Sequence, residues 1–90
     1  MPRVIITADV EDGTRWEAGF RGHADLFRSQ TSTVMRYTVD SNQVALYTEV
    51  TDLAKFTEVL QSPATVEAMG VDGVKRETVK VYTLDKEVPL

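Results

Sequence analysis

Residues 33–50, Thr-Val-Met-Arg-Tyr-Thr-Val-Asp-Ser-Asn-Gln-Val-Ala-Leu-Tyr-Thr-Glu-Val, decide the fold of this chain. Residues 33–39 and 43–50 are rich in β-branched and aromatic side chains, which favour strands. The segment between them, Asp40-Ser41-Asn42, consists of typical turn residues. A connection this short predicts that the two strands pair as an antiparallel hairpin.

The stretch before the hairpin predicts a strand followed by a helix. Residues 3–10 are β-branched and alternate, with Val4, Ile6, Ala8 and Val10 on one face. In residues 14–29, four side chains recur at helical spacing and fall within an arc of about 60° on one helix face. These four are Trp16, Phe20, His23 and Phe27. Asp12 or Thr14 can cap the start of this helix.

The stretch after the hairpin predicts two short helices and a last strand. Thr51 or Asp52 caps a helix in which Leu53, Phe56 and Leu60 share a face. Ser62 followed by Pro63 is typical of a new helix start. We expect that helix to close with Gly70 in the left-handed position and Val71 as the hydrophobic contact after it. Residues 77–84 predict the final strand.

The resulting order, β-α-β-β-α-β, is the ferredoxin-like motif. We therefore predict an α+β fold in which residues 1–90 form a single ferredoxin-like domain. Its helices cover one face of a four-stranded antiparallel sheet. The strands carry apolar residues on both faces, which predicts that the second face is covered as well. A chain of 90 residues without cysteine gains extra burial most simply by oligomerisation, so we expect a homodimer through the sheet face.

Composition excludes several kinds of partner. The net charge of −4 argues against DNA or RNA, whose binding depends on neutralising phosphates. No apolar run reaches the roughly 18 residues that cross a membrane, and the first residues lack the pattern of a secretory signal. We therefore expect a cytoplasmic location. One histidine, no cysteine, and acidic residues 9, 11 and 12 without EF-hand spacing predict no metal site.

The chain resembles the dimeric α+β barrel superfamily, which includes the antibiotic-biosynthesis monooxygenase-like proteins. The resemblance rests on the element order, on Trp16-x-x-x-Phe20-x-x-His23, and on Ser62-Pro63 followed by Glu67-Ala68-Met69-x-x-x-Gly73-Val74. It implies that two sheets pack into a barrel and that a small molecule sits between sheet and helices. The superfamily includes cofactor-free oxygenases, isomerases and haem-degrading enzymes. The haem-degrading pattern fits poorly, since the only asparagine, Asn42, lies in a turn.

His23 is the candidate catalytic residue, because an imidazole on an apolar helix face can act as a general base. The alternative is a helix-face histidine that is hydrogen-bonded to a strand group or lies at the edge of the stripe. The candidate ligand-binding residues are Trp16, Phe20, Phe27, Met35, Arg36 and Tyr37. Trp16 could instead anchor the core. Arg36 could hold a ligand carboxylate or pair across the hairpin with Glu49.

These observations leave more than one class of function open. The first is a small-molecule-binding dimer, such as a cofactor-independent monooxygenase or isomerase-like enzyme acting on a small aromatic or polyketide-like substrate. For it we expect no cofactor, because the superfamily that the chain resembles includes cofactor-free oxygenases. No glycine-rich motif supports a nucleotide cofactor. The alternatives are a non-catalytic dimeric module for ligand sensing or protein interaction, and a structural dimer with a filled pocket.

Overall fold

Strands and helices follow one another along the chain in the predicted order. We describe a computed structural model that covers residues 2–28 and 30–89, with only the backbone of Ser32 and Thr33. Its elements are β1 (Arg3–Asp9), α1 (Gly13–His23), the 3₁₀ turn η1 (Ala24–Phe27), β2 (Thr31–Asp40), β3 (Gln43–Val50), α2 (Leu53–Leu60), α3 (Pro63–Asp72), the 3₁₀ turn η2 (Arg76–Thr78) and β4 (Lys80–Leu84). No helix among the described residues is long and apolar enough to span a membrane.

The four strands form one antiparallel sheet in the order β2-β3-β1-β4. At its centre, Ile5 of β1 lies opposite Tyr47 of β3 on one side and Tyr82 of β4 on the other. The hairpin predicted from residues 33–50 is present as β2 and β3, with Val39 opposite Val44 next to the turn. This strand order and the helices between the strands confirm the predicted ferredoxin-like α+β fold.

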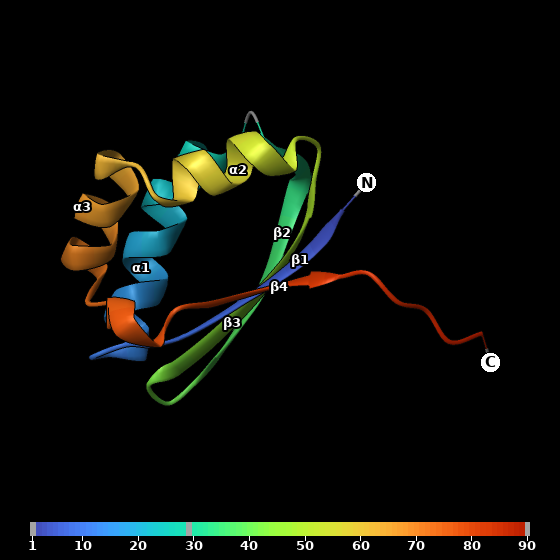
Figure 1. The fold of residues 1–90 in the computed structure, drawn as a ribbon. Helices are drawn as coiled ribbons and strands as arrows, with labels where there is room; N and C mark the ends of the chain where they lie inside the picture. The colour runs from blue at the N-terminus through green and yellow to red at the C-terminus, as the bar shows by residue number, and fades with distance from the viewer. Residues whose placement is uncertain (1, 29, 90) are drawn as a thin grey trace.

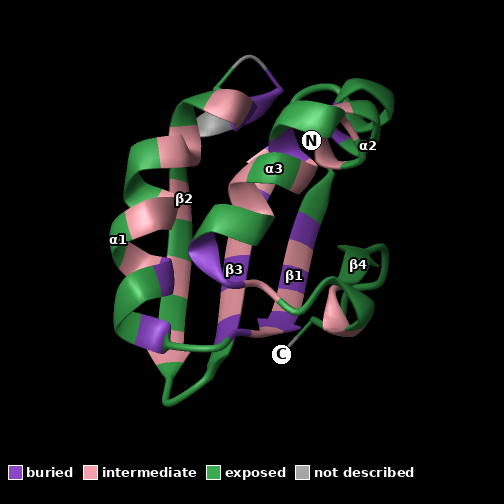
Figure 2. Ribbon diagram, turned by 90° about the vertical axis from the view of Figure 1, so that its left-hand side faces the viewer, coloured by how far each residue is buried: buried purple, intermediate pink, exposed green. Residues whose placement is uncertain are grey.

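The helices form a layer on one face of the sheet (Figure 1). The core lies between the two layers, where the alternating residues of β1 and β3 are buried (Figure 2). Two aromatic side chains complete it from the helix side, Phe27 of η1 and Phe56 of α2, with ring centroids 5.5 Å apart. Beyond β4, residues 85–89 lead away from both layers (Figure 1).

Side-chain caps fix where each helix begins. The carboxylate of Asp12 accepts hydrogen bonds from the backbone N–H groups of Thr14 and Arg15 at the start of α1. Asp52 caps α2 in the same way, and the Ser62 hydroxyl caps α3 with Pro63 in the first turn. Each cap satisfies donors that the first helical turn leaves without partners. The cap at Ser62 was predicted from the sequence, and Asp12 and Asp52 were each one of two predicted alternatives.

The predicted end of α3 at Gly70 was wrong. The helix continues to Asp72, and Gly73 takes the left-handed conformation with φ of 77°. The N–H of Gly73 donates to the carbonyl of Gly70, and the N–H of Val74 donates to that of Met69. These are the bonds of a glycine-terminated helix, displaced three residues along the chain. Val71, expected to make the closing hydrophobic contact, is 60% exposed.

Two other predicted boundaries were also wrong. The first helix was predicted over residues 14–29, but α1 ends at His23 and continues only as the tighter turn η1; Ser29 lies outside the described residues. The last strand was predicted from residue 77, but Arg76–Thr78 form η2 and β4 begins at Lys80. The Thr78 hydroxyl accepts a hydrogen bond from the N–H of Asp9 at 2.8 Å, which holds η2 at the end of β1.

The sheet face away from the helices carries both apolar and charged side chains. Apolar residues on it are Ile5, Ala45 and Tyr47, which are half-buried, and Val34, Tyr82 and Leu84, which are exposed. The predicted cross-strand pair of Arg36 with Glu49 was wrong, because the register sets Arg36 opposite Tyr47. Glu49 lies opposite Arg3 instead, and their side chains form an ion pair at 3.9 Å.

Candidate functional site

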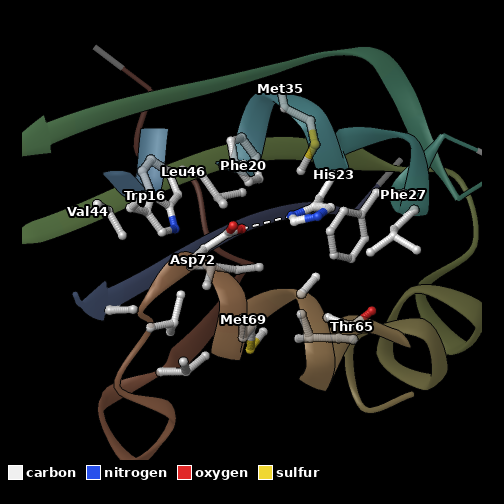
Figure 3. Close-up of a pocket in the computed structure, with 17 residues that line it drawn as sticks. Trp16, Phe20, His23, Phe27, Met35, Val44, Leu46, Thr65, Met69 and Asp72 are labelled. Carbon is white, nitrogen blue, oxygen red and sulfur yellow. Dashed lines mark hydrogen bonds and ion pairs between the residues drawn. The ribbon is translucent and has the colours of Figure 1, made fainter. Parts of the chain in front are cut away.

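An apolar cavity of about 70 Å³ lies between α1, α3 and the sheet. Ile6, Ala8, Val44 and Leu46 form its floor on β1 and β3. Side chains of α1, η1 and α3 form the walls (Figure 3). The volume is about half that of the roughly 150 Å³ cavity in which a protein core is known to take up benzene. An aromatic ring therefore enters only if side chains in the wall move.

Stacked aromatic rings of α1 form one wall. The rings of Trp16 and Phe20 lie nearly parallel, with centroids 4.8 Å apart, and Trp16 is 4% exposed. Tyr37 of β2 meets both rings edge to face at 5.7 Å. Its hydroxyl accepts a hydrogen bond from Arg21 and donates one to Glu17, each at 2.8 Å. These two hydrogen bonds hold the Tyr37 ring against α1, because both partners of its hydroxyl belong to that helix.

Two polar side chains meet at the cavity wall. His23 is the last residue of α1, and Asp72 is the last residue of α3. Nδ1 of His23 lies 3.0 Å from Oδ2 of Asp72 (Figure 3). A carboxylate that is ionised only accepts hydrogen bonds, so its contact with Nδ1 requires a proton on Nδ1. A neutral imidazole in that tautomer keeps its lone pair on Nε2.

The two partners differ in burial. Asp72 is 5% exposed, whereas the His23 side chain is 38% exposed. His23 borders the cavity and also a surface groove between α1 and α3, and it shares both with Leu26 and Ala68. Phe20 and Met35 likewise separate the cavity from a second groove, beside β2. These shared side chains are the ones whose movement would enlarge the cavity towards solvent.

The structure brings together five of the seven residues singled out from the sequence. Lining the cavity are Trp16, Phe20, His23, Phe27 and Met35. Tyr37 packs behind Trp16 and Phe20 and lines the groove beside β2, outside the cavity. Arg36 is exposed on the other face of the sheet, so it does not contribute to this cavity. Whether the five residues bind a ligand stays a prediction.

Asp72 was not singled out from the sequence. A signal for it was present in the apolar stripe of α1. Gly19 lies three residues after Trp16 and four before His23, on the same side of the helix, and it leaves a gap in the stripe. A side chain at position 19 would overlap the Asp72 carboxylate. A glycine in the middle of an apolar helix face is a sign that another group approaches closely.

Among the described residues, no three histidine, aspartate or glutamate side chains gather as they would around a metal ion. The polar side chains that line the cavity are His23, Thr65 and Asp72, and of these His23 and Asp72 form an imidazole–carboxylate pair. The molecule belongs by its architecture to the ferredoxin-like α+β domains with an apolar cavity between helices and sheet.

Solved structures with this fold include an oxygenase and proteins named after antibiotic-biosynthesis monooxygenases. SnoaB from Streptomyces nogalater, described as a cofactor-independent oxygenase, has a TM-score of 0.71 and 16% identity, with 99% of this chain and 95% of that chain covered. A putative antibiotic biosynthesis monooxygenase from Deinococcus radiodurans has a TM-score of 0.68 and 12% identity, covering 100% and 96%. One from Nitrosomonas europaea has a TM-score of 0.58 and 13% identity, covering 96% and 98%.

The predicted resemblance to this superfamily is confirmed at the level of fold. No protein-family model matches the sequence, and no curated protein matches it either.

Proposed function

We propose that the protein is an oxygenase that needs no bound cofactor and that acts on a small aromatic substrate with an acidic C–H bond. The observation that carries the proposal is the His23–Asp72 contact in the wall of an apolar cavity. A base beside a water-poor space suits a reaction in which a proton must leave carbon and the resulting anion must meet oxygen. The fold shared with a cofactor-independent oxygenase adds support.

In the proposed reaction, Nε2 of His23 takes a proton from a substrate methylene group. The carbanion transfers its electrons to O₂, and a C–O bond forms to give a peroxide. The proton on His23 returns to the terminal peroxide oxygen. Loss of water from the hydroperoxide leaves a ketone, so one CH₂ group and one O₂ give one C=O group and one H₂O. Trp16 and Phe20 would hold the substrate ring, because flat aromatic faces pack well against each other.

The test is oxygen uptake with anthrone, an aromatic probe whose methylene group lies between two rings. We expect purified protein treated with a chelator and free of flavin to consume one O₂ for each anthraquinone formed. The rate should be clearly above that of protein-free buffer, in which anthrone oxidises slowly. Retention or binding of aromatic probes without any faster oxygen uptake would favour the alternative, a non-catalytic ligand-sensing module.

We also infer that two copies pair through the open faces of their sheets. At the centre of the open face of the sheet lie three half-buried apolar residues, Ile5, Ala45 and Tyr47. The exposed side chains of Val34, Tyr82 and Leu84 lie on the same face. Exposed apolar groups clustered on one face favour association. The ion pair of Arg3 with Glu49 adds a polar border, as expected of an interface.

Sedimentation at micromolar concentration tests this pairing. We expect the 10.1-kDa chain to sediment as a species of about twice that mass. The side chain of Tyr82 is 49% exposed in the isolated chain and lies on the open face. Tyr82→Arg places a charge on that face and should give a monomer. Val71→Arg on α3 is the matched control, because Val71 is at least as exposed but lies in the helix layer. A wild-type monomer at this concentration would contradict the pairing.

A further inference from the structure

The buried carboxylate of Asp72 lacks a complete set of partners. Its Oδ2 contacts Nδ1 of His23, but Oδ1 has no hydrogen-bond partner among the described residues. The cavity is otherwise apolar apart from Thr65, whose hydroxyl donates to the Val59 carbonyl. Burying an unpaired carboxylate oxygen in such surroundings is unfavourable, and an apolar side chain at position 72 would avoid the cost. Packing of the hydrophobic core therefore does not explain why residue 72 is an aspartate.

Gly19 admits the carboxylate to this position. A Cβ atom at residue 19 would overlap Oδ1 of Asp72 and crowd the rest of the carboxyl group. The indole nitrogen of Trp16, one turn earlier in α1, points towards the same carboxylate (Figure 3). Gly22, in the same helix, has no atom within 4 Å of the place a Cβ would take. Of these two glycines in α1, only Gly19 is required by its surroundings.

The backbone around Asp72 is fixed from both sides. Gly73, in its left-handed conformation, ends α3 directly after Asp72. On the other side, a guanidinium nitrogen of Arg15 donates to the carbonyl of Val71 at 2.8 Å, which ties the last turn of α3 to α1. Arg15 is itself held by Glu11 at 3.2 Å. The carboxylate is therefore presented to His23 by a restrained turn.

We propose that Asp72 is a positioning residue that keeps the Nδ1 proton on His23 and thereby leaves the lone pair on Nε2. The proposal rests on the proposed role of His23 as the base. A carboxylate on one ring nitrogen fixes both the tautomer and the orientation of an imidazole. It also stabilises the imidazolium that exists while the proton is held. Asp72 touches neither substrate nor oxygen in this role.

Nitrogen NMR of ¹⁵N-histidine-labelled protein tests the tautomer without any substrate. His23 is the only histidine, so each ring nitrogen gives one signal for the whole chain. In the neutral form, we expect a protonated Nδ1 and an unprotonated Nε2. Asp72→Asn keeps the shape of the side chain but removes its charge, and its signals should move towards the form with the proton on Nε2. A wild-type spectrum with the proton on Nε2 would overturn the proposal.

Two glycine variants provide an independent test that leaves Asp72 itself unchanged. Gly19→Ala should displace the carboxylate and shift the imidazole signals as Asp72→Asn does, while Gly22→Ala should keep the wild-type signals. Unchanged signals in Gly19→Ala would overturn the proposal. With anthrone, Asp72→Asn should lower the oxygen-uptake rate by about 10- to 100-fold. If the wild-type protein takes up no oxygen but has the expected tautomer, the proposed function fails and the positioning contact stands.

Discussion

Replacing His23 by glutamine should lower the rate of oxygen uptake with anthrone by about 10²- to 10⁴-fold, the usual contribution of a general base. Glutamine is close to histidine in reach, and its amide N–H can still donate to Asp72. It cannot take up a proton, so the variant removes the base while keeping the polar contact. The rate is measured with an oxygen electrode in parallel with the absorbance of anthraquinone.

A matched control separates this effect from damage to the fold. Glu58→Gln changes an exposed side chain of α2, away from the cavity, and should keep the wild-type rate. The far-ultraviolet circular dichroism of both variants should equal that of the wild type. A His23→Gln variant that is folded and retains the wild-type rate would exclude His23 as the base, and the proposed mechanism with it.

Replacing Phe56 by alanine should lower the free energy of unfolding by about 3–5 kcal/mol. Phe56 is 1% exposed, packs against Phe27, and joins α2 to the core formed by β1 and β3. Its loss removes apolar burial and leaves a cavity that the surrounding helices fill only in part. Natural domains have a total stability of only about 5–15 kcal/mol, so this one change removes a large fraction of it.

Denaturant unfolding followed by tryptophan fluorescence measures the effect. Trp16 is the only tryptophan and is buried in the native state, so its emission reports the loss of the core. Leu53→Ala is the control on the same helix, because Leu53 is 37% exposed. It should cost less than about 1 kcal/mol, in keeping with other changes at exposed positions. Equal losses in the two variants would show that Phe56 is not a central core residue.

Periodicity was sufficient to predict the sheet. In β1, every second residue from Val4 to Ala8 is buried, as the alternation of residues 3–10 indicated. A strand in the middle of a sheet is constrained on both edges, so its register follows from its own pattern. The burial pattern of β4 does not alternate, because every residue from Lys80 to Leu84 is exposed in the isolated chain. Its start depends on the contact between Thr78 and Asp9, residues 69 positions apart, which no local pattern contains.

The end of α3 could not be predicted from local signals. Gly70 and Gly73 are both able to take the left-handed conformation that ends a helix. What separates them is the packing of the last turn of α3 against α1, where Arg15 reaches the Val71 carbonyl and Gly19 admits Asp72. These contacts favour one more turn of helix. The same long-range packing explains why Asp72 was missed while the stripe containing His23, a property of one helix, was found.

The helix layer and the sheet supply different kinds of residue to the cavity, which has a consequence for engineering. Both polar members of the candidate site come from helices, while β1 and β3 give the cavity only apolar floor residues. The side chains proposed for pairing lie on the opposite face of the same sheet. A substitution at Asp72 in the helix layer and one at Tyr82 on the open face lie on opposite sides of the sheet, so their free energies should add. A designer could therefore combine helix-layer variants of the cavity with open-face variants without searching the two sets jointly.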